Sequence, residues 1–416
     1  MTRKMKDSGI EWIGEIPEEW EVVPARYFFK ANKKIVGRKE NEYERLSLTM
    51  KGVLKKSKYN SEGLQPSNFN SYQILTKNQI VFKLIDLQNV STSRVGISPY
   101  KGIVSPAYII IDRKDTKTNN RFYYYWYMSM YLNKVFNLLG DAGVRSNINA
   151  TELLELKVPR TSFREQNIIS NFLDKKTEQI EDIKSTIMKG IQILEDYKKS
   201  VITEAVTKGL DKNVEMKDSG VEWIGEIPKH WSVSRIKYLT TSRSEKGNLS
   251  DTNKYIGLEN VESKTGKYIK TDTDYIDAVY DQCKKGDLLY GKLRPNLNKV
   301  LISPFDASCT GEFEIIKEST IDKKWLYYYF LTPGFTNIVN SSTFGAKMPR
   351  ASWDFIGNIK IAYPNDSEMQ EIVSYIEFIT SATDIAICSK QKQLEVLEEY
   401  KKSLIYEYVT GKKEVL

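Results

Sequence analysis

The chain has 416 residues, of which 40% are hydrophobic and 28% are charged, so it is expected to fold and to hold about two to four domains. Its formal net charge of +8 raises the odds of nucleic-acid binding only slightly. Three cysteines without CxxC spacing argue against a disulfide framework or a structural zinc site and favour a reducing cytoplasm. Neither a signal peptide nor a membrane span is expected, because the sequence has no apolar run of the necessary length.

The first predicted element is a segment that occurs twice. Residues 5–20 read MKDSGIEWIGEIPEEW, and residues 216–231 read MKDSGVEWIGEIPKHW. The two copies differ at only three positions, which are Ile10/Val221, Glu18/Lys229 and Glu19/His230. Their spacing is too long for a solenoid or a propeller repeat. It predicts two halves of the same architecture related by an approximate two-fold axis, a symmetry that double-stranded DNA shares.

A globule is predicted after each copy, over roughly 21–158 and 232–363. Both stretches contain short strand-like runs separated by Gly, Asn and Pro, and both contain an aromatic, helix-like run, at 122–127 and 325–330. The 26 Tyr and 15 Phe of the chain could stack on bases, although most are expected to lie in the cores. The fold class predicted for each half is therefore α/β (α+β).

A long helix is predicted after each globule, over 164–209 and 367–411. Apolar residues in the first helix recur in alternating steps of four and three, which is the spacing of a coiled-coil seam. At 1.5 Å per residue such a helix is roughly 60 Å long. The seam residues predicted for the first helix are Ile169, Leu173, Ile180, Ile183, Ile187, Leu194, Tyr197 and Val201.

The second long helix keeps this seam only at its ends. Its predicted seam residues are Ile372, Ile376, Ile379, Leu397, Tyr400 and Leu404. A helix with a polar centre usually needs a partner, so we expect the two long helices to pair. A two-fold relation between the halves would make them antiparallel. The alternative is that each helix packs separately on its own globule.

No catalytic signature can be found in the sequence. It contains no GxxxxGK[ST], GxGxxG or HExxH motif and no Asn/Asp-Pro-Pro-aromatic motif of nucleotide methyltransferases. His230 is the only histidine, which removes a Ser-His-Asp or Cys-His arrangement. Glu312 and Glu314 alternate in a strand-like run and are interpreted as a solvated face or a base contact. The chain is therefore not expected to be an enzyme, to hold a metal or to bind a cofactor.

Polar loops in both globules are typical of nucleic-acid binding, because Arg and Asn can read base edges and Lys neutralises phosphate. Each loop alone could be an ordinary solvated loop, but four such loops in parallel positions favour binding. The candidates in the second globule are Tyr290, Lys292, Arg294, Asn296, Asn298, Lys299, Lys347 and Arg350. The candidates in the first globule are Lys83, Gln88, Asn89, Arg94, Arg145 and Asn147.

With these motifs the chain resembles the specificity subunits of Type I restriction-modification systems. The resemblance rests on the twin DSG[IV]EWIGEIPxxW segments, the run GDLLYGKLRPNLNKV at 286–300, and the two long helices that end in YKKS-[VL]I, and it spans nearly the whole chain. It implies one target recognition domain per globule, each reading one half of a split, asymmetric DNA site. It also implies that the long helices set the spacing of the half-sites and dock methyltransferase subunits.

The resemblance further implies the partners and the location of the chain. The expected partners are double-stranded DNA, two methyltransferase subunits and restriction/translocase subunits, with no membrane. S-adenosylmethionine is expected on the methyltransferase, which methylates adenine, and no cofactor on this chain. The protein is expected in the cytoplasm. The residues alone leave one alternative, a two-headed protein-binding scaffold with no DNA role.

The predicted organisation has four segments. The first target recognition domain with its repeat segment covers 1–158, and the first long helix covers 159–215. The second target recognition domain with its repeat segment covers 216–363, and the second long helix covers 364–416. The first globule lacks a GKLRP-like run and has KLIDLQN at 83–89 and KGIVSPAY at 101–108 instead. This difference implies a different subfamily of recognition domain and a different half-site.

Overall fold

The computed structural model describes residues 3–58, 68–85, 87, 94–140, 147–249, 253–271, 278–343, 345 and 348–415. The chain divides into unit 1, which is Met1–Ile187 with Lys392–Leu416, and unit 2, which is Met188–Gln391. The division cuts both long helices, α4 (Phe163–Lys208) and α9 (Asp366–Val409). The boundaries of the four predicted segments stay a prediction.

The described residues of unit 1 form two four-stranded sheets and three short α-helices. Its strands are β1 (Met5–Asp7), β2 (Glu15–Pro17), β3 (Glu21–Pro24), β4 (Phe29–Ala31), β5 (Arg45–Thr49), β6 (Gly52–Lys56), β7 (Gln73–Leu75), β8 (Ile80–Phe82), β9 (Val95–Ile97), β10 (Gly102–Val104), β11 (Ile109–Arg113) and β12 (Lys157–Arg160). Its short helices are α1 (Asn120–Leu132), α2 (Val135–Gly140) and α3 (Ala150–Glu155).

The first sheet of unit 1 has the order β4-β11-β8-β9 with antiparallel neighbours. The second has the order β6-β5-β10-β7, in which β5 and β10 are parallel. The hairpin β1-β2 and the pair β3-β12 complete the unit. Helix α1 is the predicted aromatic run. Asn119 caps it by accepting from two backbone N–H groups, and its aromatic side chains, Phe122 and Trp126 among them, lie in the core.

Unit 2 repeats this plan. Its strands are β13 (Met216–Asp218), β14 (Glu226–Pro228), β15 (Ser232–Arg235), β16 (Thr240–Ser242), β17 (Lys246–Asn248), β18 (Tyr255–Ile256), β19 (Val279–Cys283), β20 (Leu288–Gly291), β21 (Val300–Ile302), β22 (Ala307–Cys309), β23 (Phe313–Ser319) and β24 (Lys360–Tyr363). Its short helices are α5 (Ile236–Leu239), α6 (Lys323–Leu331), α7 (Pro333–Ser341) and α8 (Trp353–Asn358).

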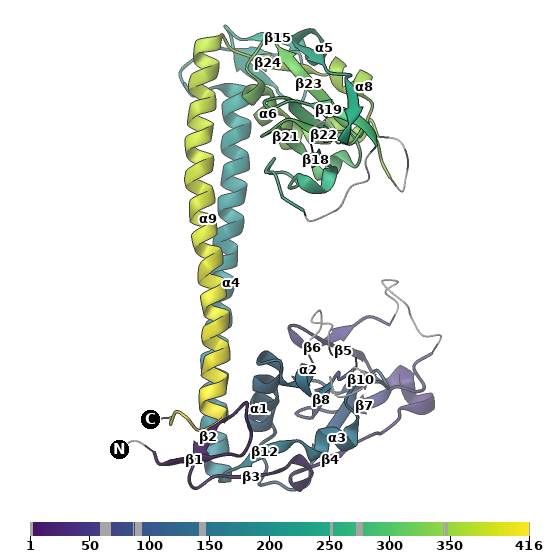
Figure 1. Ribbon diagram of the computed structural model, residues 1–416, viewed down its shortest axis with the longest axis vertical. Coiled ribbons are helices and arrows are strands. Elements are labelled where there is room, and N and C mark those ends of the chain that lie inside the picture. The colour runs from purple at the N-terminus through teal and green to yellow at the C-terminus, as the bar shows by residue number, and fades with distance from the viewer. Residues whose placement is uncertain are drawn as a thin grey trace. The chain divides into compact units, whose positions relative to one another are not determined.

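The sheets of unit 2 have the orders β16-β23-β20-β21 and β17-β19-β22-β18. The first is antiparallel, like β4-β11-β8-β9, and the second again contains one parallel pair, β18 with β22. The hairpin β13-β14 and the pair β15-β24 match β1-β2 and β3-β12. Two halves of the same mixed architecture, predicted from the repeat, are therefore confirmed (Figure 1).

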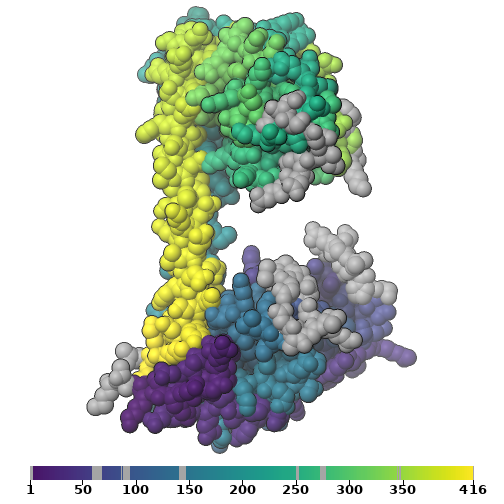
Figure 2. Space-filling view, in the orientation of Figure 1, coloured from purple at the N-terminus to yellow at the C-terminus, as the bar shows by residue number. Residues whose placement is uncertain are grey.

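The repeated segment holds the start of a long helix in each unit. In unit 1 the buried indole of Trp20 donates its N–H to Glu165, in the first turn of α4, at 2.9 Å. In unit 2 Trp231 donates to Glu368, in the first turn of α9, at 3.0 Å. Figure 2 shows the purple N-terminal segment packed against the yellow end of α9 in unit 1, where the Tyr406 hydroxyl donates to the carbonyl of Ile13.

Each globular core takes in the start of one long helix and the end of the other. The core of unit 1 includes Ile169 and Leu173 from α4 together with Ile405 and Val409 from α9. The core of unit 2 includes residues from the start of α9, such as Ile372, and residues from the end of α4. Helix pairing and packing on a globule, which the sequence left as alternatives, therefore occur together.

The long helices run antiparallel in unit 1. The ammonium of Lys401 donates to the carboxylate of Glu181 at 2.7 Å, and Lys184 forms an ion pair with Glu398. Because the residue number rises along α4 as it falls along α9, the helices point in opposite directions. Burial alone would raise the pKa of Glu181, but the hydrogen bond and the charge of Lys401 lower it below its usual range.

The same antiparallel pairing occurs in unit 2. Lys198 donates to Asp384 at 2.8 Å, and the side chain of Lys390 lies over Gly190, which leaves room for it. Burial alone would raise the pKa of Asp384, but hydrogen bonds from Lys198 and Lys267 lower it. The antiparallel arrangement predicted from the sequence is therefore confirmed in both units.

The seam itself differs from the predicted one at three residues. Ile183, Tyr197 and Tyr400 are 49%, 49% and 52% exposed and lie outside the seam. One residue further along each helix, a lysine faces the partner helix instead, at Lys184, Lys198 and Lys401. The aliphatic stem of a lysine can pack in a seam while its ammonium reaches a carboxylate at the edge.

The other predicted seam residues are covered to differing degrees. Those that are buried are Ile169, Leu173, Ile180, Ile372, Ile376 and Leu404. Those that are half-buried are Ile187, Leu194, Val201, Ile379 and Leu397.

Helix α9 is unusually apolar for a helix with so much exposed surface. Its most apolar window of 18 residues has a mean hydropathy of 1.3, enough by length and composition to cross a membrane, and 22% of that window is buried. Helices of soluble proteins pass the same test, so the window is only a weak indication. The expectation that the chain has no membrane span therefore stays a prediction.

We expect Ile180→Ala to lower the free energy of unfolding by about 2–5 kcal/mol, because Ile180 is 4% exposed and its removal leaves a cavity. Ile183→Ala is the matched control, three residues away on the same helix, and should change the free energy by no more than about 0.5 kcal/mol. Urea unfolding followed by circular dichroism measures both. Equal losses would mean that Ile183 belongs to the seam after all.

Candidate nucleic-acid interface

The polar run of unit 2 forms a tight loop at the end of a buried strand. β20 ends at Gly291, and the chain turns through a short 3-10 helix, Pro295–Leu297, before β21 begins. Arg294 and Asn298 flank this turn with φ of +50° and +44°, a left-handed conformation that most residues avoid. The strained backbone fixes where the side chains between β20 and β21 point.

The second predicted cluster joins this loop. Leu293 forms an isolated β-bridge with Arg350, and the N–H of Arg294 donates to the carbonyl of Pro349 at 2.7 Å. The N–H of Ala351 donates to the carbonyl of Lys292 at 3.0 Å. The structure therefore brings together two predicted clusters that lie more than fifty residues apart in the sequence.

Two carboxylates form ion pairs with two of the cations of these joined clusters. Lys292 donates to Glu314, on β23, at 3.2 Å, and Arg350 forms an ion pair with Glu312, just before β23. The pair Lys292–Glu314 is mostly covered, whereas the guanidinium side of Arg350–Glu312 is half exposed. The alternation of Glu312 and Glu314 in the sequence therefore serves to orient cations.

Arg294 and Asn296 project from the same loop with exposed side chains. Lys264, which the sequence did not single out, also belongs here, because its N–H donates to the carbonyl of Asn298 at 3.0 Å. No local pattern marks Lys264, and only the fold places it beside the loop. We name this surface the basic loop surface and define it as Lys264, Lys292, Arg294, Asn296 and Arg350.

Three residues of unit 2 that were predicted to contact DNA have structural roles instead. Tyr290 is 1% exposed because β20 is a central strand, and its ring packs on Phe330 and Phe335. Asn298 is 3% exposed and donates to the hydroxyl of Thr336 at 2.7 Å.

Lys299 is the third. Its ammonium donates to the carbonyls of Leu258 and Val261 at 2.6 and 2.8 Å, and burial lowers its pKa. These bonds hold the loop against the segment that contains Leu258 and Val261. The ammonium of Lys299 is therefore not directed at a ligand.

The predicted contacts of unit 1 are only partly described. Lys83 and Arg94 lie at the open end of the β8-β9 hairpin, where the N–H of Lys83 donates to the carbonyl of Arg94 at 3.0 Å. Arg94 is 2% exposed, so its side chain does not present a surface for DNA contact. Asn147 is exposed beside α3. The predicted residues Gln88, Asn89 and Arg145, and Lys347 in unit 2, lie outside the described residues.

Within the described residues, no group of three or more His, Cys, Asp or Glu side chains is arranged to hold a metal ion. The chemistry available at the basic loop surface is therefore that of guanidinium, ammonium and amide groups. Such groups can pair with phosphate oxygens and with base edges.

Comparisons with known proteins agree on one family to which the chain is similar. Residues 17–192 match the family model of the Type I restriction modification DNA specificity domain. The specificity subunit of the Type I restriction enzyme MjaVIII of Methanocaldococcus jannaschii is 24% identical over 430 residues, which cover 95% of this chain and 93% of that subunit. Residues 17–192 therefore match the DNA specificity domain of Type I systems, and the chain is similar to Type I restriction-modification specificity subunits along nearly its whole length.

A second relative matches a smaller part. The specificity subunit of the Type I restriction enzyme EcoDI of Escherichia coli is 25% identical over 280 residues, 62% of this chain and 63% of that subunit. The chain thus spans slightly less than two thirds of the length of the EcoDI subunit.

Solved structures show the same fold. One solved chain comes from a study of complex assembly and conformational transition of the type I R-M system. It has a TM-score of 0.68 at 10% identity, and the match covers 95% of the present chain and 98% of the solved one. The crystal structure of the HsdS subunit from Thermoanaerobacter tengcongensis has a TM-score of 0.52 at 10% identity, with 96% and 98% covered. The predicted fold class is therefore confirmed.

We expect Arg294→Ala to weaken DNA binding by about 1–3 kcal/mol if Arg294 reads a base, and to relax specificity at one position of the site. A phosphate contact would instead weaken binding uniformly across sequences. Lys360→Ala, which removes an exposed cation from β24 in a different sheet, is the matched control and should leave affinity unchanged. Fluorescence anisotropy with duplexes at fixed salt measures both, and equal losses would show a purely non-specific charge effect.

Proposed function

We propose that unit 1 and unit 2 of this specificity subunit each recognise one half of a bipartite, asymmetric DNA site. The role in DNA recognition follows from the family, and the division into halves is supported by the duplicated architecture. The observation that carries the proposal is the basic loop surface of unit 2, where exposed Arg294 and Asn296 lie among two carboxylate-held cations.

The carboxylates of the basic loop surface give it a simple mechanism. An exposed ion pair contributes only about 0–1 kcal/mol, so Arg350 can exchange Glu312 for a phosphate at little cost. Lys292 stays closer to Glu314 and fixes the loop. Arg294 and Asn296 then have the donor and acceptor groups that read guanine and adenine edges in the major groove. The cations would fix the register of the loop on the DNA backbone. Arg294 and Asn296 would determine which bases are recognised.

The long helices are proposed to set the spacing of the half-sites. α4 has 46 residues, which correspond to about 69 Å at 1.5 Å per residue, and α9 has 44 residues. Their length is independent of the loops that read bases. Spacing and sequence preference are therefore expected to change separately.

The catalytic partners are also part of the proposal. Two methyltransferase subunits with S-adenosylmethionine would methylate adenine, and restriction/translocase subunits would cut DNA, while this chain supplies no catalytic group. Apolar side chains that are about two thirds exposed on the long helices favour such docking, and they are Ile193, Phe378, Ile385 and Val396. A two-headed scaffold without a DNA role finds no support in the comparisons.

The proposal is tested by co-expressing the chain with its methyltransferase in a host that lacks other adenine methylation and mapping N6-methyladenine by long-read sequencing. We expect one motif with two unlike halves and a fixed gap. The Arg294→Ala variant should lower methylation or relax the half read by unit 2 and leave the other half unchanged. Methylation that does not depend on this chain would contradict the proposal.

Lengthening both helices should lengthen the gap between the half-sites. Because Gly190 and Lys390 face each other, seven residues inserted after each keep the heptad register of the pair and add about 10.5 Å, or about three base pairs. Insertion after Gly190 alone is the control and should disrupt the pair. An unchanged gap in a folded, active double insertion would refute the role of the helices as a spacer.

A further inference from the structure

A cation, Arg3, lies two residues before the first copy of the repeat, and the second copy lacks it. In unit 1 the guanidinium of Arg3 donates to Glu165 and to Glu19 at 2.7 Å each, and it lies 3.6 Å from Glu414. Its central carbon lies 5.3 Å from the centroid of the Trp20 ring. Three carboxylates and an indole thus form a guanidinium site that the chain fills with its own side chain.

Unit 2 has the same site without the cation. In the repeat alignment Val214 takes the place of Arg3, and His230 takes the place of Glu19. In the helix alignment Glu368 takes the place of Glu165, and Asp211 takes the place of Glu414. The indole of Trp231 still donates to Glu368 at 3.0 Å, so the frame of the site is kept.

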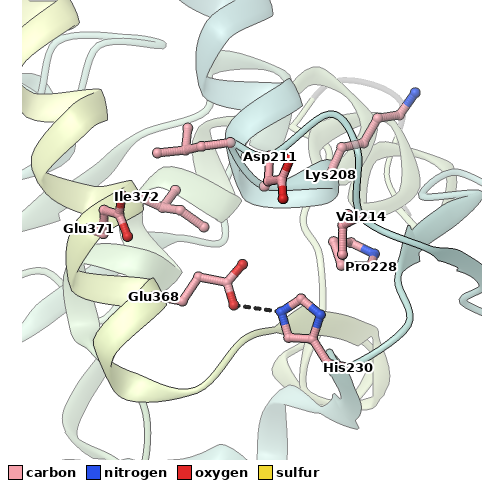
Figure 3. A pocket seen from close by; sticks show the side chains of 10 residues that line it. Lys208, Asp211, Val214, Pro228, His230, Glu368, Glu371 and Ile372 are labelled. Carbon is pink, nitrogen blue, oxygen red and sulfur yellow. Dashed lines mark hydrogen bonds and ion pairs between the residues drawn. The ribbon is translucent and has the colours of Figure 1, made fainter.

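A cavity of about 280 Å³ lies at this position in unit 2. Its lining includes Val214, His230, Glu368 and Asp211, the counterparts of the residues that make the Arg3 site, and one further carboxylate, Glu371. Figure 3 shows the carboxylates of Asp211 and Glu368 turned toward the cavity. The loss of a long side chain at position 214 therefore leaves a space lined by the same kinds of groups.

The charges around the cavity favour a cation. Asp211, Glu368 and Glu371 are acidic, while His230 bonds Glu368 through its Nε2 at 2.7 Å and leaves the second carboxylate oxygen to the indole of Trp231. Lys208, the only lysine of the lining, points its ammonium away from Glu368 (Figure 3). A planar guanidinium matches carboxylates with paired hydrogen bonds better than an ammonium does.

We propose that this cavity of unit 2 is a binding site for a guanidinium group that comes from outside the chain. The source is an arginine side chain of a partner polypeptide or a free guanidino compound. Unit 1 does not need such a ligand, because Arg3 fills its site. The two halves of the chain therefore differ in one binding site although they share their fold, and this inference does not depend on DNA recognition.

The probe for the test is N-acetyl-arginine methylamide, and the readout is the indole N–H signal of Trp231 in the NMR spectrum of the full chain, assigned with Trp231→Phe. We expect a saturable shift of this signal and no shift of the Trp20 signal, because Arg3 occupies the site in unit 1. The citrulline analogue, which has the same shape without the charge, should not bind. Equal binding of both compounds would overturn the proposal.

Two variants test the site without touching the Trp231–Glu368 bond. Val214→Arg restores the side chain found in unit 1 and should abolish binding of the probe, whereas Val214→Leu is the control and should bind it. Asp211→Asn removes one charge and keeps the bond that its side chain accepts from the N–H of Asn213, and it should weaken binding about tenfold. Undiminished binding by Val214→Arg would place the probe elsewhere and refute the site.

The assembled methyltransferase complex distinguishes the two sources. If the Trp231 signal no longer responds to the probe in the complex, an arginine of a partner subunit occupies the cavity. If the response is retained, the site is open to a free guanidino compound. Failure of DNA binding in either preparation would bear on the proposed function and leave this result unaffected.

Discussion

A hydrogen bond from a buried indole to the first turn of a long helix organises each half of this protein. Trp20 donates to Glu165, and Trp231 donates to Glu368. The bond joins the repeated segment to the start of one helix, and glycine at the end of the other helix allows the indole to approach. Gly411, at φ +71°, lies so close to Trp20 and Pro17 that a Cβ there would overlap the proline ring. A charge-assisted bond to a carboxylate is stronger than a neutral one, and here it fixes the start of one long helix against the repeated segment.

This constraint explains why the repeat is so exact while the globules differ. The apolar residues of the repeated segments pack in the cores and against the helix ends. The loops that project from the sheets do not take part in this packing, so their sequences can differ between the halves. Two units of the same architecture whose loops differ would suit the split, asymmetric site proposed above, in which each half can change without the other.

The frame is not perfectly symmetric, and the difference has a chemical consequence. Arg3 completes one junction of helix, repeat and helix end with its own charge, while Val214 leaves the equivalent junction with a cavity lined by three acidic side chains. Asp211 and Glu371 are exposed, and Glu368 is bonded by His230 and Trp231. A guanidinium ligand that binds the folded unit 2 and not the unfolded chain would stabilise this unit.

The sequence by itself determined the duplication, the two long helices, their antiparallel pairing and the general place of the polar loops, because repeats and hydrophobic periodicity are local patterns. It could not choose between Ile183 and Lys184 for the seam, since both lie within one step of the heptad and only the carboxylate of Glu398 on the partner helix decides between them. Nor could it separate exposed Arg294 from buried Tyr290, which are four residues apart. Which residues of a loop are exposed, and that Arg350 joins Leu293, depend on strand neighbours far away in the chain, and only the tertiary structure brings those neighbours together.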